Sequence, residues 1–337
     1  MLHTASLTDL SAFHCGHAHN NDAGTGCTVV VAPAGATCGV DVRGGGPATR
    51  ETDLLRPENM IEAVHAVVLS GGSAFGLAAS TGVMDELAAR DIGFEMGGAR
   101  VPIVVGACLF DLLVGENAHP DAAMGQAACR AALDGEPGAV LAEGNVGAGT
   151  GASVGKLLGP ERAMKAGFGV CGLRMGEMVA CALVAVNAFG NVRGADGTWI
   201  AGCRDDAGRV MEPLEAFAAL AASEAAGGGT GADAAAGTAP CTNTTIGVVL
   251  TNARLTKAQA TKVSSTAHDA YARAIKPVHT LNDGDTIFTF ASGEVDASPD
   301  AVAILATEAL QGAIERAVRT ATSAYGLPAA NDLPTTH

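Results

Sequence analysis

Cys241-Thr-Asn-Thr-Thr-Ile-Gly-Val-Val-Leu250 joins an Asn-Thr pair to an apolar run of strand length. It follows residues 224–240, a low-complexity segment rich in Gly and Ala that cannot pack a core and that we expect to be a flexible linker. A linker that leads to Asn243 and Thr244 at the start of a buried strand suits a chain that cuts itself between these two residues. An ordinary Thr-rich strand start is the alternative.

Cleavage before Thr244 would place a hydroxyl and a free α-amine on one residue. Such an amine has a pKa of about 7.7–8.0, so it can act as a general base at neutral pH. A threonine hydroxyl paired with its own N-terminal amine is an established form of nucleophilic catalysis. The segment therefore predicts a large chain of residues 1–243 and a small chain of residues 244–337.

A second informative stretch is His279-Thr-Leu-Asn-Asp-Gly-Asp-Thr-Ile-Phe288. Asp283 and Asp285 lie two residues apart at the entry to a strand, so we expect their side chains on one side of it. Two carboxylates there could hold an N-terminal ammonium or accept a hydrogen bond from the Thr244 hydroxyl. A solvated Asp-Gly-Asp turn is the alternative.

Glycine-rich turns raise the question of nucleotide binding. The segment 144–152 resembles a phosphate cradle, but the residues after it do not continue as a dinucleotide-binding unit. Gly151-Ala-Ser-Val-Gly-Lys156 is one residue short of a P-loop, so we do not expect a nucleotide. Lys156 is a single cation among small apolar residues, and it is either a surface-turn lysine or a buried one with a lowered pKa.

Composition limits the classes of function. Of the 337 residues, 48% are hydrophobic and 16% charged, which excludes a disordered chain. The net charge of −15 argues against a nucleic-acid or anionic-membrane partner. No apolar run reaches the 18 residues or so of a spanning helix, and the N-terminal sequence lacks the pattern of a secretory signal. We therefore expect a cytoplasmic protein.

Metal and disulfide sites are not predicted. The nine cysteines are scattered and include no Cys-x-x-Cys pair. His14, His17 and His19 form the best candidate cluster, and alternation would place the last two on one face of a strand. No second group of ligands stands out, so we expect neither metal nor cofactor.

Strand-length apolar runs alternate with Ala-rich segments of helical periodicity, which predicts an α/β fold with layered sheets. One fold over residues 1–337 is favoured, with the linker as a loop inside it, because few strands follow residue 250. Thr256 is the expected N-cap of the helix that follows it. The expected strands are Cys27–Ala32, Ala66–Leu69, Val101–Val105, Met178–Val186, Ile246–Thr251 and Thr286–Phe290, and the expected helices are Ala74–Ala89, Ala122–Leu133, Pro213–Ala225, Lys257–Ile275 and Pro299–Ala324.

Three further motifs, at 40–59, 69–76 and 144–151, resemble the self-processing aminopeptidase family typified by L-aminopeptidase/D-amidase-esterase and the β-peptidyl aminopeptidases. The resemblance extends over nearly the whole chain. The stretches 243–246 and 279–288 are most similar to the threonine branch, which includes the nylon-oligomer hydrolases.

The resemblance implies an N-terminal-nucleophile hydrolase with a four-layer αββα sandwich. It implies the nucleophile Thr244, the cleavage site Asn243–Thr244, the paired carboxylates Asp283 and Asp285, the active-site Lys156 and the oxyanion donor Asn187. An amide donor at a strand end suits a developing oxyanion. Phe75, Gly72 and Gly149 are expected to line the substrate pocket, and Phe75 stands where several relatives carry Tyr.

These observations favour a hydrolase that releases N-terminal residues from small peptides, amino-acid amides or esters through an acyl-Thr244 intermediate. An acyltransferase of the ornithine acetyltransferase type is a second hypothesis, and it differs in the group that accepts the acyl chain. A non-catalytic small-molecule binding protein is a third. The resemblance also implies a homo-oligomer, a tetramer of processed heterodimers.

Overall fold

The computed structural model describes residues 2–225 and 243–333. The predicted linker lies mostly outside these ranges, and only its first two residues are described, as the end of a helix. The main sheet has ten strands: β1 (Leu2–Ala5), β2 (His14–Asn20), β3 (Thr25–Val42), β4 (Ala48–Arg50), β5 (Val64–Ser70), β8 (Val104–Cys108), β11 (Phe168–Met175), β12 (Met178–Asn187), β15 (Thr244–Ala253) and β17 (Thr286–Val295). Their order is β1-β11-β12-β15-β17-β3-β5-β8-β4, with β2 beside β3.

The 18-residue strand β3 connects two parts of this sheet. Residues 25–31 of β3 pair with β2 and β5, whereas residues 37–42 pair with β17. The register against β5 shifts between Val31 and Ala36, where β3 leaves one part of the sheet for the other. One continuous strand thus belongs to both sheet layers.

Alternation along the strands separates three apolar cores. Even-numbered residues of β12 from 178 to 186 pack with the helices α4 (Lys257–Ala274) and α5 (Pro299–Arg319). Odd-numbered residues 179–185 face the other way and pack with Val67 and Leu69 of β5, between the two layers. On the far side, Val29 and Val31 pack under α1 (Ala79–Ala89) and α2 (Ala122–Asp134).

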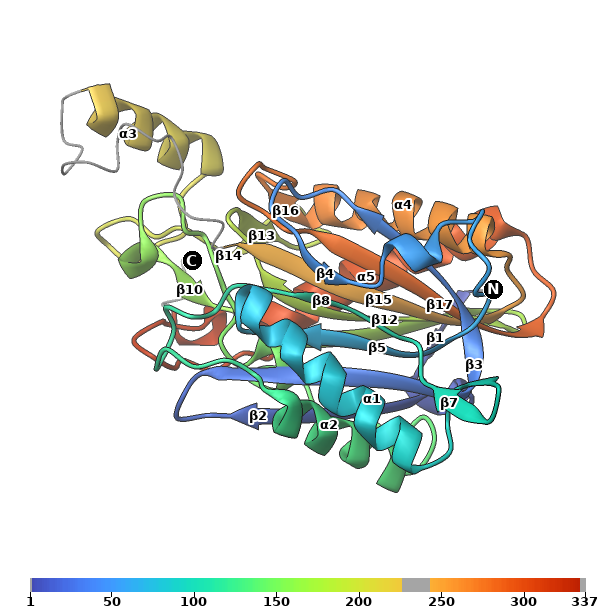
Figure 1. The fold of residues 1–337 in the computed structure, drawn as a ribbon. Helices are drawn as coiled ribbons and strands as arrows, with labels where there is room; N and C mark the ends of the chain where they lie inside the picture. Colours follow the sequence, from blue (N-terminus) through green and yellow to red (C-terminus); the bar gives the residue numbers. More distant parts are fainter. Residues whose placement is uncertain (1, 226–242, 334–337) are drawn as a thin grey trace.

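The layers therefore follow the order helix, sheet, sheet, helix, which confirms the predicted αββα sandwich (Figure 1). Small residues allow the close packing that the Gly- and Ala-rich composition requires. A Cβ added to Gly169 of β11 would lie 2.1 Å from the main-chain oxygen of Ala313 on α5. At that position only glycine lets the helix approach the sheet so closely.

Most of the predicted helices and strands are present, and the differences lie mainly in where they begin and end. Thr256 caps α4 as expected, and Gln259 completes a capping box. The predicted helix 299–324 ends at Arg319. The predicted strand 101–105 was wrong as a unit, because Pro102 lies in a break between β7 (Ala99–Val101) and β8. Strand β11 was not predicted, since two glycines and half-buried positions weaken its pattern.

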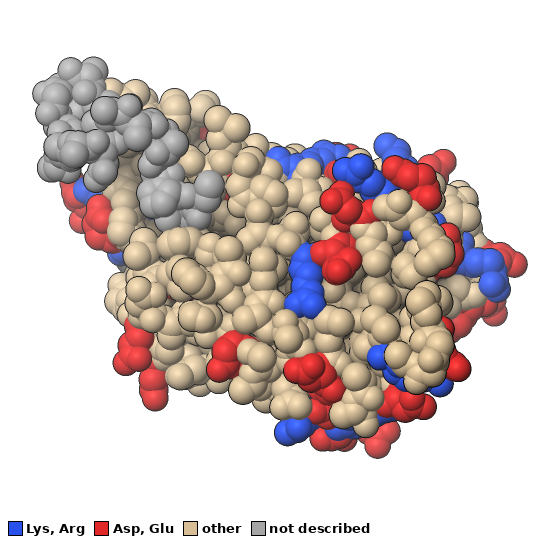
Figure 2. Space-filling view, in the orientation of Figure 1, with Lys and Arg blue, Asp and Glu red and all other residues tan. Residues whose placement is uncertain are grey.

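Smaller elements surround the sandwich. Helix α3 (Pro213–Ala225) projects from the body in Figure 1. None of the helices in the described ranges combines the length and apolar character that crossing a membrane requires. On the face in Figure 2, acidic side chains lie along the rim and also near the middle, beside a Lys or Arg, and a broad uncharged area lies to the left of them. The remaining strands are β6 (Phe94–Met96), β9 (Ser153–Val154), β10 (Met164–Lys165), β13 (Asn191–Arg193), β14 (Trp199–Ala201) and β16 (Ile275–Lys276), and the 3-10 turns are η1 (Leu7–Asp9), η2 (Asp53–Leu55), η3 (Ser73–Ala78), η4 (Gly147–Gly149), η5 (Pro160–Arg162) and η6 (Ala330–Asp332).

Candidate active site

Thr244 is the first residue of β15, in the middle of the main sheet. It pairs with Asn187 at the end of β12, and β15 continues in parallel beside β17. The preceding residue, Asn243, forms a parallel bridge with Asp283. All four of these side chains are buried. The sheet itself thus fixes the predicted cleavage site, with partners on both sides.

The peptide carbonyl before Thr244 is hydrogen-bonded twice. The Thr244 hydroxyl donates to the Asn243 oxygen, and the Gly284 N–H donates to the same oxygen at 3.2 Å. Gly284 also gives the hydroxyl its room, because a Cβ at this residue would lie 2.7 Å from Thr244 Oγ1. The hydroxyl therefore lies against the carbonyl group that it would attack, and a backbone donor is directed at that carbonyl oxygen.

The two carboxylates have different partners. Asp285 accepts the Thr245 N–H at 2.8 Å through Oδ1, and His279 binds its Oδ2 through the main-chain N–H (3.1 Å) and ring Nδ1 (2.8 Å). Asp283 accepts the Thr280 N–H at 2.8 Å and the Thr280 hydroxyl at 2.6 Å. Burial, and then the charge of Asp285, raises the pKa of Asp283, while Thr280 and Lys156 oppose the shift. The pair is therefore not a solvated turn.

Lys156 and Asn187 form the opposite side of the site. Lys156 Nζ donates to Asn187 Oδ1 at 2.7 Å and lies 3.4 Å from the Asn187 main-chain oxygen. The Ser153 N–H also donates to Asn187 Oδ1, at 3.1 Å, and Asn187 Nδ2 donates to the Phe110 carbonyl at 2.9 Å. Burial lowers the pKa of Lys156 to about 7, although the nearby Asp283 and Asp111 oppose this shift. Lys156 is thus not a solvated turn lysine.

Two charged residues behind the site were missed by the sequence analysis. Lys165 is fully buried, and its Nζ donates to three main-chain oxygens, including that of Gly149 at 3.1 Å. Asp111 accepts the Gly72 N–H at 2.6 Å and the Thr25 hydroxyl at 2.8 Å. Burial lowers the pKa of Lys165 to about 7 and raises the pKa of Asp111 to about 6. A lone charge inside an apolar stretch, the signal that singled out Lys156, marks both.

A mostly apolar cavity of about 550 Å³ opens beside Lys156. Phe75, Gly72 and Gly149 are not among the described residues that line it. Phe75 is 64% exposed and stacks on His119, whereas the two glycines bind Asp111 and Lys165 through their main chains. The lining residues are Phe110, Asp111, Leu113, Val114, Ser153, Lys156, Leu157, Gly159, Pro160, Glu161, Ala163, Phe189, Leu220, Tyr325, Gly326 and Leu327.

Among the histidines near the N-terminus, His17 is held by other partners. His17 lies on β2, where Nδ1 contacts the Thr28 hydroxyl at 2.9 Å and Nε2 contacts the Ala142 oxygen at 3.1 Å. Burial lowers the pKa of His17 to about 4. Within the described ranges, no group of three or more His, Cys, Asp or Glu side chains is arranged to hold a metal ion.

Comparison with known proteins decides the family. The sequence model of peptidase family S58 matches residues 5–331. The chain belongs to peptidase family S58. An uncharacterized aminopeptidase of Mycobacterium leprae is 40% identical, over 96% of this chain and 92% of that protein. The 6-aminohexanoate-oligomer endohydrolase of Paenarthrobacter ureafaciens is 32% identical, over 86% of this chain and 75% of that protein.

Solved structures agree with this S58 fold. A Burkholderia sp. beta-aminopeptidase superimposes with a TM-score of 0.61 at 21% identity, over 93% of this chain and 86% of that one. The L-aminopeptidase D-Ala-esterase/amidase of Ochrobactrum anthropi, described as a variant of the Ntn-hydrolase fold, gives 0.63 at 18% identity, over 95% and 88%. The S58 chain is thus an aminopeptidase-type hydrolase with an Ntn-hydrolase fold, which confirms the predicted family.

Proposed function

We propose that the chain cuts itself between Asn243 and Thr244 and then releases N-terminal residues from small peptides, amino-acid amides or esters through an acyl-Thr244 intermediate. The contact of the Thr244 hydroxyl with the carbonyl group before it supports this most directly. Because Thr244 begins a strand that is paired with β12 and lies beside β17, the fold itself keeps its hydroxyl next to the Asn243 carbonyl, and neither a substrate nor a partner is needed. The fold of residues 1–337 would then persist as two associated chains.

Self-cleavage would proceed as an acyl shift within one residue. Thr244 Oγ loses its proton to a base and bonds to the carbonyl carbon of Asn243, the carbon–nitrogen bond breaks, and the base returns the proton to the freed α-amine of Thr244. Water then hydrolyses the ester and leaves the Asn243 carboxylate. The Gly284 N–H, at 3.2 Å from the carbonyl oxygen, supports the negative charge that develops there.

A base is needed before the α-amine exists. We assign this role to Lys156, because its lowered pKa of about 7 leaves a neutral fraction at neutral pH, and because Asn187 connects it to the start of β15. After cleavage the α-amine of Thr244 becomes the base. Asp283 and Asp285 flank its position and stabilise the ammonium form.

The cavity beside Lys156 suits a substrate whose acyl group consists of an apolar chain that ends in an ammonium group. Its lining residues are mainly aliphatic and aromatic, and they include the acidic Asp111 and Glu161 together with Lys156. A carboxylate in an apolar wall suits a cationic end of the substrate. The 32%-identical relative is a 6-aminohexanoate-oligomer endohydrolase, and oligomers of 6-aminohexanoate fit a substrate of this kind.

Assembly into a homotetramer of processed heterodimers is part of the proposal. Large apolar side chains are exposed on α3, at Leu214 and Phe217, and on the β6–β7 hairpin, at Phe94 and Met96. Apolar groups of this size on a surface are common in protein interfaces.

Intact mass spectrometry of the purified protein tests the proposal. We expect two species. One ends at Asn243 and has a mass of about 24 kDa, and the other begins at Thr244 and has a mass of about 9 kDa, as estimated from their shares of the chain length. Turnover of an amino-acid anilide should appear together with these species. A single 33.3 kDa chain with full activity would refute self-cleavage. An uncleaved and inactive chain would favour the binding-protein hypothesis, and transfer to an amine in preference to water would favour the acyltransferase.

A further inference from the structure

His279 belongs to the segment that carries both carboxylates, yet the proposed reaction assigns it no role. It contacts Asp285 twice, through the main-chain N–H at 3.1 Å and ring Nδ1 at 2.8 Å, both at Oδ2. The other oxygen of Asp285 accepts the N–H of Thr245, the residue after the nucleophile, at 2.8 Å. Asp285 is therefore a buried bridge between His279 and the start of β15.

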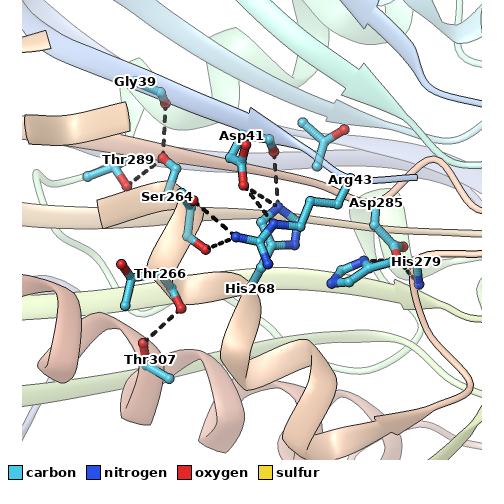
Figure 3. Close-up of polar contacts among 12 residues, drawn as sticks. Gly39, Asp41, Arg43, Ser264, Thr266, His268, His279, Asp285, Thr289 and Thr307 are labelled. Atoms are coloured by element: carbon cyan, nitrogen blue, oxygen red, sulfur yellow. Dashed lines mark hydrogen bonds and ion pairs between the residues drawn. The ribbon is translucent and has the colours of Figure 1, made fainter. Parts of the chain in front are cut away.

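The ring of His279 is held in place from behind by α4. Its centroid lies 4.8 Å from that of His268, nearly perpendicular, and 6.0 Å from that of Tyr271, which it faces at 29°. His268 is itself fixed, because its Nε2 contacts the Asp41 main-chain oxygen at 3.1 Å. Figure 3 shows the His279 ring beside Asp285, with His268 next to Asp41 and Arg43.

The backbone of His279 is also adjusted to this contact. Its φ of 56° lies in the left-handed region, which residues other than glycine rarely adopt and which tends to occur at functional sites. This conformation directs the main-chain N–H and Nδ1 to the same carboxylate oxygen. An ionised carboxylate only accepts hydrogen bonds, so the tautomer of His279 with its proton on Nδ1 is the one that fits this contact.

We propose that His279 is the positioning residue of Asp285. Through Nδ1–H and N–H it fixes the carboxylate so that Oδ1 holds the Thr245 N–H and, with it, the orientation of Thr244. Nε2 finds no hydrogen-bond partner among the described residues, so the contacts of His279 support positioning of Asp285 through Nδ1. The inference rests on the proposed function, since it assigns His279 to the reaction of Thr244.

Two substitutions separate the ring N–H from the backbone conformation. Both Asn and Gly tolerate a positive φ, but only His279→Asn keeps a side-chain N–H near the place of Nδ1. We expect His279→Gly to lower kcat and the self-cleavage rate by about 10²-fold with little change in KM, since a misplaced reacting group costs about this factor. His279→Asn should be at least about tenfold faster than His279→Gly, as expected for a restored positioning contact.

A double-mutant cycle with Asp285→Asn tests whether His279 acts through Asp285. If it does, adding His279→Gly to Asp285→Asn should slow the reaction by less than about threefold, because the two losses are not independent. Melting temperatures of all variants identify those that fail to fold. If His279→Gly or the double mutant fails to fold, the rate of His279→Asn alone tests the inference. Equal rates for the Asn and Gly variants, a wild-type rate for His279→Gly, or multiplying losses would each overturn the inference.

The same series distinguishes this inference from the proposed function. Thr244→Ala serves as the reference, because it removes the nucleophile and leaves His279 and Asp285 in place. An active Thr244→Ala would overturn the proposed function and the inference with it. An inactive Thr244→Ala together with multiplying losses at His279 and Asp285 would overturn the inference alone.

Discussion

Gly284→Ala is the substitution whose effect the geometry of the site predicts most directly. The new Cβ would lie 2.7 Å from Thr244 Oγ1 and 3.0 Å from the Gly46 oxygen, which is main chain and cannot rotate away. Ordinary van der Waals contact begins at 3.4 Å, so the hydroxyl or the loop must move by about 0.7 Å. A displacement of about 1 Å at a reacting group costs about 10²-fold. We therefore expect self-cleavage to slow by about 10- to 100-fold.

The assay follows the appearance of the chain 244–337 on denaturing gels after synthesis, with the melting temperature measured in parallel. Gly312→Ala on α5 is the matched control, because its Cβ would lie 2.8 Å from the Cys171 sulfur, a similar overlap remote from Thr244. The control should be cleaved at the wild-type rate. Wild-type cleavage in Gly284→Ala, at an unchanged melting temperature, would show that the hydroxyl does not react from its position in the structure.

Three further outcomes are expected. Thr244→Ala should abolish both self-cleavage, followed on gels, and turnover of the anilide. Thr244→Ser should keep part of each activity, because it retains a hydroxyl and an amine. Full activity in Thr244→Ala would refute the mechanism. Since the pKa of Lys156 is lowered to about 7, its neutral form increases with pH, so the cleavage rate should rise about tenfold per unit below pH 7 and level off above it. Lys156→Met should be slow at every pH, and an unchanged pH profile there would exclude Lys156 as the base. Light scattering should give a mass well above 33.3 kDa at micromolar concentration, and a monomer would contradict the assembly.

Local sequence patterns predicted an α/β fold with layered sheets, and the resemblance to the aminopeptidase family predicted the four-layer αββα order. The continuous apolar runs Met178–Val186 and Ile246–Thr251 mark strands buried on both faces, and Thr256 marks the start of α4. Strand β11 lacks such a pattern, because Gly169 and Gly172 replace large side chains where other backbones approach. It pairs with the next strand, β12, but the backbones that its glycines accommodate belong to α5 and the end of β1, which are distant in sequence.

The candidate site was predictable only in part, because its residues meet through the fold. The sequence indicated Thr244 and the two carboxylates from adjacent motifs. It left open whether Lys156 is buried, since burial depends on segments such as Phe110 and Asn187 that pack near it. Asp111 and Lys165 were missed for the same reason: most of the groups that accommodate their charges, such as Thr25 and Gly72 for Asp111 and Gly149 for Lys165, are distant in sequence. No short motif encodes such partners.

The placement of β15 and β17 between β12 and β3 bears on how the protein can fold at all. Both inserted strands come from residues 244–337, whereas their outer neighbours come from residues 1–243. In the uncut chain, these strands find their places by an intramolecular search, whose rate does not depend on concentration. Once the chain is cut, the same search requires two molecules to meet. We therefore expect the denatured precursor to refold at a rate that does not depend on its concentration. The denatured mature protein should refold more slowly as it is diluted. In practice, the cut protein would then not recover its native structure once its two chains have separated in dilute solution.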